Sequence, residues 1–101
     1  MSKIGQALKS TGLPCAYSHF GDKLQKPPYI VYIGSGQEAE EADNTIYWKE
    51  NRYQVEYYFT EKSEANEEAI EAALLEYGFL YQKSEDNYID DQRVFVIYYQ
   101  V

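Results

Sequence analysis

"NRYQVEYYFT", residues 51–60, alternates between two kinds of side chain. The odd positions are apolar or aromatic: Tyr53, Val55, Tyr57 and Phe59. The even positions are mostly polar: Arg52, Gln54, Glu56 and Tyr58. This alternation predicts a strand with one face in a core, where each buried side chain contributes about 1.5–3 kcal/mol. Shifting the strand by one residue would bury Arg52 and Glu56, so its register is strongly specified.

The segments before this strand indicate a helix, an extended segment, a loop and a strand. Residues 2–12, SKIGQALKSTG, predict a short helix that Ser2 caps and Gly12 ends. Residues 13–20 predict a short extended segment, and Gly21 to Pro28 predict a loop. The unbroken apolar run Tyr29 to Ile33 is typical of a strand covered on both faces.

The next segment is small and acidic, and we expect an exposed loop there. It comprises residues 35–43, SGQEAEEAD. Residues 44–50, NTIYWKE, then predict a second strand. The short spacing favours a hairpin between this strand and the 51–60 strand, with the turn near Asn51.

The clearest helix covers residues 63–78, with Ser63 as its N-cap and Gly78 at its end. One face of this helix is apolar: Ile70, Ala73, Leu74 and Tyr77. Residues 93–101, RVFVIYYQV, are apolar at both odd and even positions, which predicts a central strand covered on both sides. The order helix, strands, helix, strands predicts an α+β fold, with a mainly antiparallel sheet and two helices packed on one face. A length of 101 residues indicates a single domain, residues 1–101.

The composition limits the classes of partner. The formal net charge is −8, and the basic residues are scattered, so we expect no sequence-specific binding to nucleic acid. No apolar run is long enough for a membrane helix, and the N-terminal stretch is too short for a signal peptide. A soluble intracellular protein is therefore expected. Tyrosine is abundant, at 12 residues, and it favours both strands and protein interfaces.

Residues with catalytic or metal-binding chemistry are few. Cys15 and His19 are the only residues of their kinds, and an extended backbone would hold them some 13 Å apart by roughly 3.3 Å per residue. The acidic stretch 84–91, SEDNYIDD, lacks the spacing and the glycine of a calcium loop, so a solvated turn is expected. The sequence therefore predicts no enzyme, no cofactor and no metal site.

Five stretches together carry a resemblance to a known family. They are LPCAYSHF (13–20), KPPYIVYIGSG (26–36), ADNTIYW (42–48), RYQVEYYFTEKSEANEEAIEAAL (52–74) and YIDDQRVFVIYYQV (88–101). In this order they resemble the small tail-completion proteins of long-tailed bacteriophages and prophages. These proteins are also called tail terminators or minor capsid head–tail joining proteins. The likeness spans most of the chain, although each motif also follows from ordinary strand and helix composition.

The resemblance implies a structural protein of the virion, made in the bacterial cytoplasm. Such a subunit forms a ring, usually sixfold, that caps the tail tube and joins it to the head connector. Its partners are then copies of itself, tail-tube proteins and head-connector proteins. We expect the polar face of the 51–60 strand to form a subunit or tail-tube contact: Arg52, Gln54, Glu56 and Tyr58. Simple exposure of this face to solvent is the alternative.

Two other classes of function remain open. A small acidic interaction module or inhibitor, similar to a DNA mimic, would bind a basic partner with strong salt dependence. An enzyme or small-ligand binder would need a pocket with converging polar groups. For the expected acidic loop 35–43, the hypothesis is mobility in the free subunit and ordering on assembly.

Overall fold

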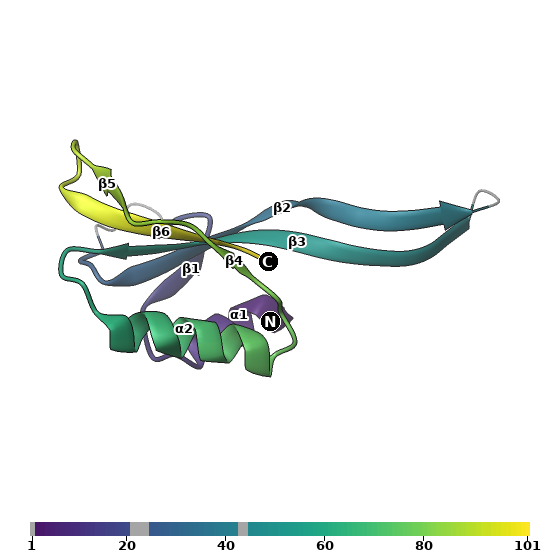
Figure 1. Ribbon diagram of the computed structural model, residues 1–101, viewed down its shortest axis with the longest axis horizontal. Coiled ribbons are helices and arrows are strands. Elements are labelled where there is room, and N and C mark those ends of the chain that lie inside the picture. The colour runs from purple at the N-terminus through teal and green to yellow at the C-terminus, as the bar shows by residue number, and fades with distance from the viewer. Residues whose placement is uncertain (1, 21–24, 43–44) are drawn as a thin grey trace.

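The described residues fold as a six-stranded sheet with two helices on one side of it (Figure 1). The computed structural model describes residues 2–20, 25–42 and 45–101. The helices are α1, Lys3–Lys9, and α2, Glu64–Glu76. The strands are β1, Cys15–Tyr17; β2, Tyr29–Ala42; β3, Thr45–Phe59; β4, Gln82–Lys83; β5, Asn87–Ile89; and β6, Val94–Gln100. The predicted α+β class is confirmed.

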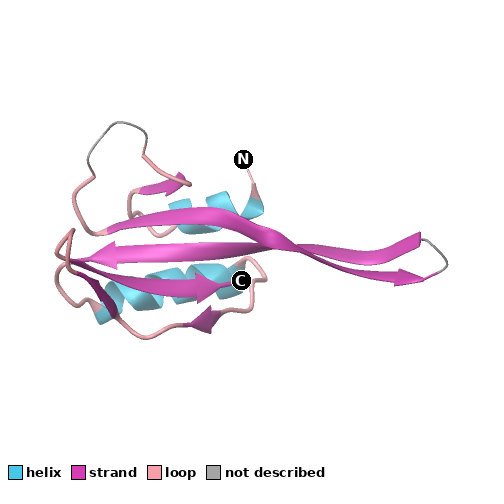
Figure 2. Ribbon diagram, turned by 90° about the horizontal axis from the view of Figure 1, so that it is seen from above, coloured by secondary structure: helices cyan, strands magenta, loops and turns pink. Residues whose placement is uncertain are grey.

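The strand order is β1-β2-β3-β6-β4, and β5 also pairs with β6. β1 runs parallel to β2, and the other described pairs are antiparallel. Thus β6 has β3 on one side and β4 with β5 on the other, which confirms its predicted central place. Figure 2 shows the helices behind the sheet, so one sheet face lies against them and the opposite face does not.

The core lies between the helices and the odd-numbered face of β3. Val55, Tyr57 and Phe59 are buried there, and Tyr53 is partly buried against the same cluster, as the alternation predicts. Neighbouring strands and both helices complete the cluster: Ile4, Leu8, Ile30, Ile70, Leu74, Ile97, Tyr99 and Val101. Because each side chain contributes about 1.5–3 kcal/mol when buried, this face fixes the register of the sheet.

Three local signals at the helix ends match their predictions, whereas α1 ends at Lys9 rather than at the predicted Gly12. The Ser2 hydroxyl accepts a hydrogen bond from the Gly5 amide at 3.2 Å, and α1 begins at the next residue. The Ser63 hydroxyl accepts one from the Asn66 amide at 3.2 Å and caps α2. Gly78 follows α2 with a φ of +85°, a left-handed conformation that favours glycine.

The long hairpin of β2 and β3 corrects two predictions. Residues 35–42 belong to β2 rather than to an exposed loop, and β3 runs through Asn51 without a turn. The register continues from Tyr29↔Tyr58 to Ala42↔Thr45, with irregularities between Gly34 and Gly36 and between Glu40 and Glu41. Backbone pairing does not require apolar side chains, so an acidic composition did not prevent strand formation here. Residue 43 of the expected loop and residue 44 of the expected strand lie outside the described residues.

The outer part of this hairpin projects from the body of the molecule. Among the described residues, residues 36–42 of β2 pair only with residues 45–52 of β3. The pairing of β1 with β2 ends at Tyr32, and the pairing of β6 with β3 ends at Gln54. The protein therefore measures 50 × 26 × 26 Å along its principal axes, with the hairpin extending along the longest one (Figure 1). We call residues 36–42 with residues 45–52 the arm.

The apolar composition of Tyr29 to Ile33 predicted a strand covered on both faces, but only part of this run is covered in this way. Ile30 and Val31 are buried, but the Ile33 residue is 40% exposed. Ile33 lies near the point where the sheet narrows to two strands, and fewer neighbours remain to cover it.

Candidate functional site

The candidate site lies on the sheet face opposite the helices. Side chains from three neighbouring strands form rows across it, because Tyr29 pairs with Tyr58 and Val31 pairs with Glu56. β6 extends these rows, since Tyr58 pairs with Val96 and Glu56 pairs with Tyr98. We call this surface the open face.

The structure brings together three of the four residues that the sequence predicted for an interface. Gln54 Nε2 donates a hydrogen bond to Glu56 Oε2 at 3.0 Å, and the Tyr58 hydroxyl donates one to Glu56 Oε1 at 2.6 Å. All three side chains are half-buried. Arg52 instead lies at the base of the arm, paired with Gly36. The predicted set therefore spans two places, the open face and the arm.

Tyr58 is fixed by both its ring and its hydroxyl. Its ring stacks on that of Tyr29, with centroids 4.9 Å apart. Burial raises the pKa of Tyr58 well above its usual value, and the hydrogen bond to Glu56 raises it further. The pKa of Tyr29 is also raised, by burial first and by the Glu56 charge second. Both hydroxyls therefore stay neutral at pH 7.

A groove of about 690 Å³ lies over this part of the open face. Its described lining comes from the open face, from the segment before β2 and from the turn before β6: Ser18, His19, Phe20, Gln25, Pro27, Tyr29, Val31, Glu56, Tyr58, Gln92 and Val94. The Phe20 ring meets the Tyr29 ring edge-on at 5.5 Å, which continues the aromatic wall from the strands into the loop. The volume falls within the range of small-ligand and side-chain pockets.

Sequence reasoning found Glu56 and Tyr58 but missed the other walls of this groove. Tyr29 and Val31 carried a usable signal, since their period of two places them on one strand face. The contribution of Phe20 and Gln92 depends on how two loops fold back over the sheet, and no local pattern encodes that.

Cys15 and His19, considered as a nucleophile and base, belong to different parts of the molecule. Cys15 is paired with Ile30 and packs against the core, whereas His19 lines the groove on the open face. Ser18, between them, has a φ of +68°, so the chain does not stay extended. Burial raises the pKa of the Cys15 thiol, partly offset by the charge of Lys9, and this disfavours a reactive thiolate.

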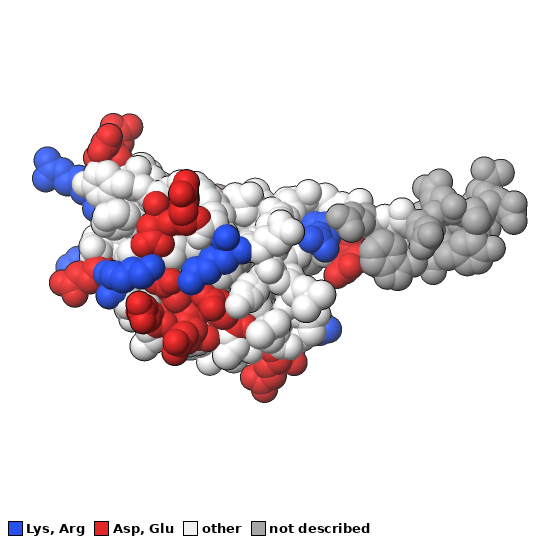
Figure 3. Space-filling view, in the orientation of Figure 1, with Lys and Arg blue, Asp and Glu red and all other residues white. Residues whose placement is uncertain are grey.

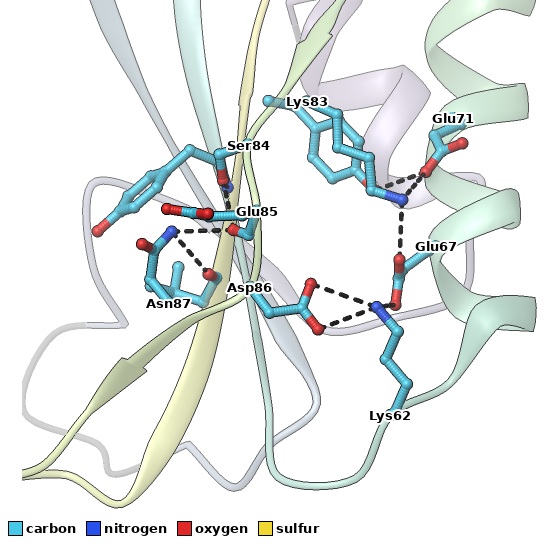
Figure 4. Close-up of polar contacts among 11 residues, drawn as sticks. Lys62, Glu67, Glu71, Lys83, Ser84, Glu85, Asp86 and Asn87 are labelled. Carbon is cyan, nitrogen blue, oxygen red and sulfur yellow. Dashed lines mark hydrogen bonds and ion pairs between the residues drawn. The ribbon is translucent and has the colours of Figure 1, made fainter.

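A second polar cluster lies on the helix side, between α2 and β4 (Figure 4). Lys83 Nζ contacts Glu67 Oε1 at 2.8 Å and Glu71 Oε2 at 2.9 Å. Lys62 Nζ lies 2.8 Å from Glu67 Oε2, an ion pair without the alignment of a hydrogen bond, and 3.0 Å from Asp86 Oδ2. We call these five residues the ionic cluster.

The ionic cluster is built around a buried carboxylate, because Glu67 is only 3% exposed. Burial alone raises the pKa of Glu67, but the contacts with Lys62 and Lys83 outweigh it and lower the pKa overall. The pKa of Glu71 is lowered in the same way, by Lys83 and by hydroxyl donors from Tyr99 and Tyr81 against the effect of burial. These contacts attach α2 to the sheet and indicate a structural role for this cluster.

Charged side chains are unevenly distributed over the described surface. Figure 3 shows Asp and Glu side chains gathered over the part of the body where α2 meets β4 and β5, with Lys side chains among them. Among the described residues, no group of three or more His, Cys, Asp or Glu side chains could hold a metal ion. Within the same ranges, no helix is long and apolar enough to cross a membrane.

Comparison of the chain with protein-family models and with characterised proteins found no match. The fold and the geometry of the open face are therefore the basis for the functional proposal.

Proposed function

We propose that this protein is a structural subunit of the head–tail junction of a phage or prophage. In this role it is similar to a tail terminator and forms a ring that caps the tail tube and joins it to the head. The observation that carries the proposal is the arm, a two-stranded ribbon that extends from an otherwise compact body. An isolated two-stranded hairpin is marginally stable in water, so a partner that covers or pairs with the arm would stabilise it.

A second feature supports assembly into a closed ring. Ring contacts are heterologous, which means that each subunit presents two different surfaces to its two neighbours. The arm and the body from which it projects would supply two such surfaces, which leaves the open face to contact a tail-tube or connector protein. Residues from the predicted interface occur on the arm and on the open face, with Arg52 at the base of the arm and Tyr58 on the open face.

The arm can be tested by removing it. Replacing residues 36–51 with an Asn-Gly turn joins β2 to β3 where Gly34 already pairs with Tyr53. The core cluster lies outside this segment, so the shortened chain is expected to keep its fold by circular dichroism. Electron microscopy and native mass spectrometry at high concentration are expected to show rings, with about six subunits, for the full chain only.

The open face can be tested by the double variant Arg52→Glu with Tyr58→Ala. Its matched control is Lys9→Glu with Tyr88→Ala, which reverses a positive charge and removes a tyrosine side chain at exposed positions away from the groove. We expect the first variant to lose binding to a tail-tube or connector protein and the control to retain it. A full chain that stays monomeric at every concentration and binds no tail or connector protein would refute the proposed function.

A further inference from the structure

The groove on the open face contains a carboxylate whose capacity to accept hydrogen bonds is only partly used. Glu56 Oε1 accepts from the Tyr58 hydroxyl, and Glu56 Oε2 accepts from Gln54 Nε2. A carboxylate oxygen has two lone pairs, so each oxygen retains a further acceptor position. The two donors also fix the orientation of the carboxylate, which reduces the entropy lost when a ligand binds.

The surroundings of Glu56 favour a cation over an anion or a purely apolar group. The described lining includes no Lys or Arg, so a positive charge that enters the groove meets no like charge from those side chains. The Tyr29 and Tyr58 hydroxyls stay neutral, since the pKa of each is raised, and their oxygens present further acceptors. Phe20 and Tyr29 add aromatic rings, which attract cations through their faces.

The charge of the whole chain points to the same class of partner. A formal charge of −8 attracts a basic segment and repels phosphate backbones. Lys62 and Lys83 contact Glu67, Glu71 and Asp86 on the helix side, so neither neutralises the open face.

We propose that this groove binds a Lys or Arg side chain presented by a basic segment of a different protein. Val31 and Val94 would contact the aliphatic stem, and Glu56 with the tyrosine hydroxyls would contact the charged end. The inference deepens the proposed function and rests on it, because it gives the chemistry of the segment that the open face contacts. Binding of a small cation to the isolated chain does not require a ring, so the two ideas can fail separately.

The experiment is a titration of the full chain, followed by amide chemical shifts, with butylguanidinium chloride as the probe. Neutral pentanamide at the same concentration and sodium chloride at matched ionic strength are the control additives. We expect saturable shifts centred on residues 29–31, 56–58 and 92–94 with the cation only. Shifts of equal size with pentanamide, or shifts spread evenly over the acidic surface, would overturn the proposal.

Two pairs of variants locate the charge that is responsible. Glu56→Gln keeps the shape and an acceptor for Tyr58 but removes the charge, and we expect at least about tenfold weaker binding. Its control is the exposed Glu85→Gln, which leaves binding unchanged. Gln92→Lys adds a cation at the exposed rim and is also expected to weaken binding, whereas Gln82→Lys on β4 is not. If Glu56→Gln fails to fold, the comparison of Gln92→Lys with Gln82→Lys still tests whether the groove binds a cation.

Other occupants give distinct results. A short oligothymidylate that shifts the same groove residues would indicate nucleic acid and overturn the proposal. Concentration-dependent shifts of these residues without any probe would indicate that a second copy fills the groove, and this would overturn it as well. A Glu56→Gln variant that is folded and binds the cation with unchanged affinity would exclude the charge recognition that the proposal requires.

Discussion

Replacing Lys83 by Met tests how strongly the ionic cluster stabilises the fold. The substitution keeps an unbranched side chain of similar size but removes the ammonium group that contacts Glu67 Oε1 at 2.8 Å and Glu71 Oε2 at 2.9 Å. Glu67, which is 3% exposed, then retains only its contact with Lys62, whose side chain is 49% exposed. Glu71 retains its hydroxyl donors.

The magnitude follows from the burial of the two partners. Removing one member of a fully buried ion pair costs about 3–5 kcal/mol, because the other charge stays buried without compensation. The Lys83 side chain is 36% exposed, and water can partly replace it, so the effect is smaller than in a fully buried pair. We therefore expect Lys83→Met to lower the free energy of unfolding by about 2–3 kcal/mol.

Urea unfolding at pH 7, followed by far-ultraviolet circular dichroism, measures this change. With a denaturant slope of about 1–3 kcal/mol/M, the unfolding midpoint falls by about 0.7–3 M. The control is Lys26→Met at an exposed site, which is expected to change stability by less than about 0.5 kcal/mol. Equal midpoints for the two variants would show that the cluster contributes no net stability, and the reasoning from its buried contacts would be wrong.

Three further predictions concern the same helix and its contacts. The pKa values of Glu67 and Glu71 are lowered in the folded state, so their stabilisation is present above the usual glutamate pKa and is lost as pH falls through the folded values. Urea midpoints between pH 7 and pH 3 are expected to fall less steeply in Lys83→Met than in the parent chain; parallel curves would contradict this. Ser63→Ala removes the N-cap bond to the Asn66 amide and is expected to cost about 0.5–2 kcal/mol by thermal unfolding, while the exposed Thr60→Ala serves for comparison. Tyr99→Phe removes a hydroxyl that donates to Glu71 Oε2 at 2.8 Å and is expected to cost about 1.5–3 kcal/mol in urea; no change would mean that this bond adds no net stability.

The fold class could be predicted from the sequence because its strongest signals are local and repetitive. The alternation in β3 placed Val55, Tyr57 and Phe59 in the core, and the helical periodicity placed Ile70 and Leu74 against them. Both patterns arise from burial of one face, and burial is the largest favourable contribution to folding. Helix ends were also predictable, since a capping hydroxyl bonds within its own turn.

The β2 half of the arm could not be predicted, although residues 44–50 were correctly expected to lie in a strand. Residues 35–42 carry small and acidic side chains, which are typical of loops, and their strand conformation depends on pairing with residues 45–52. The groove was missed for a related reason. Its outer wall includes Phe20 and Gln92, which reach the open face only through the folding of two separate loops.

The two faces of β3 illustrate how one strand can serve both stability and recognition. On the helix side, a polar substitution such as Val55→Asp would bury an unpaired charge, so that face is constrained by the core. On the open face, Glu56 is already charged and its bonds to Tyr58 and Gln54 are local to the strand, so its chemistry can change without altering the core. Period-two geometry keeps these demands separate along a single segment. A surface of this kind can be adapted to a partner while the fold stays intact, and this is why we place recognition on the open face and stability on the helix side.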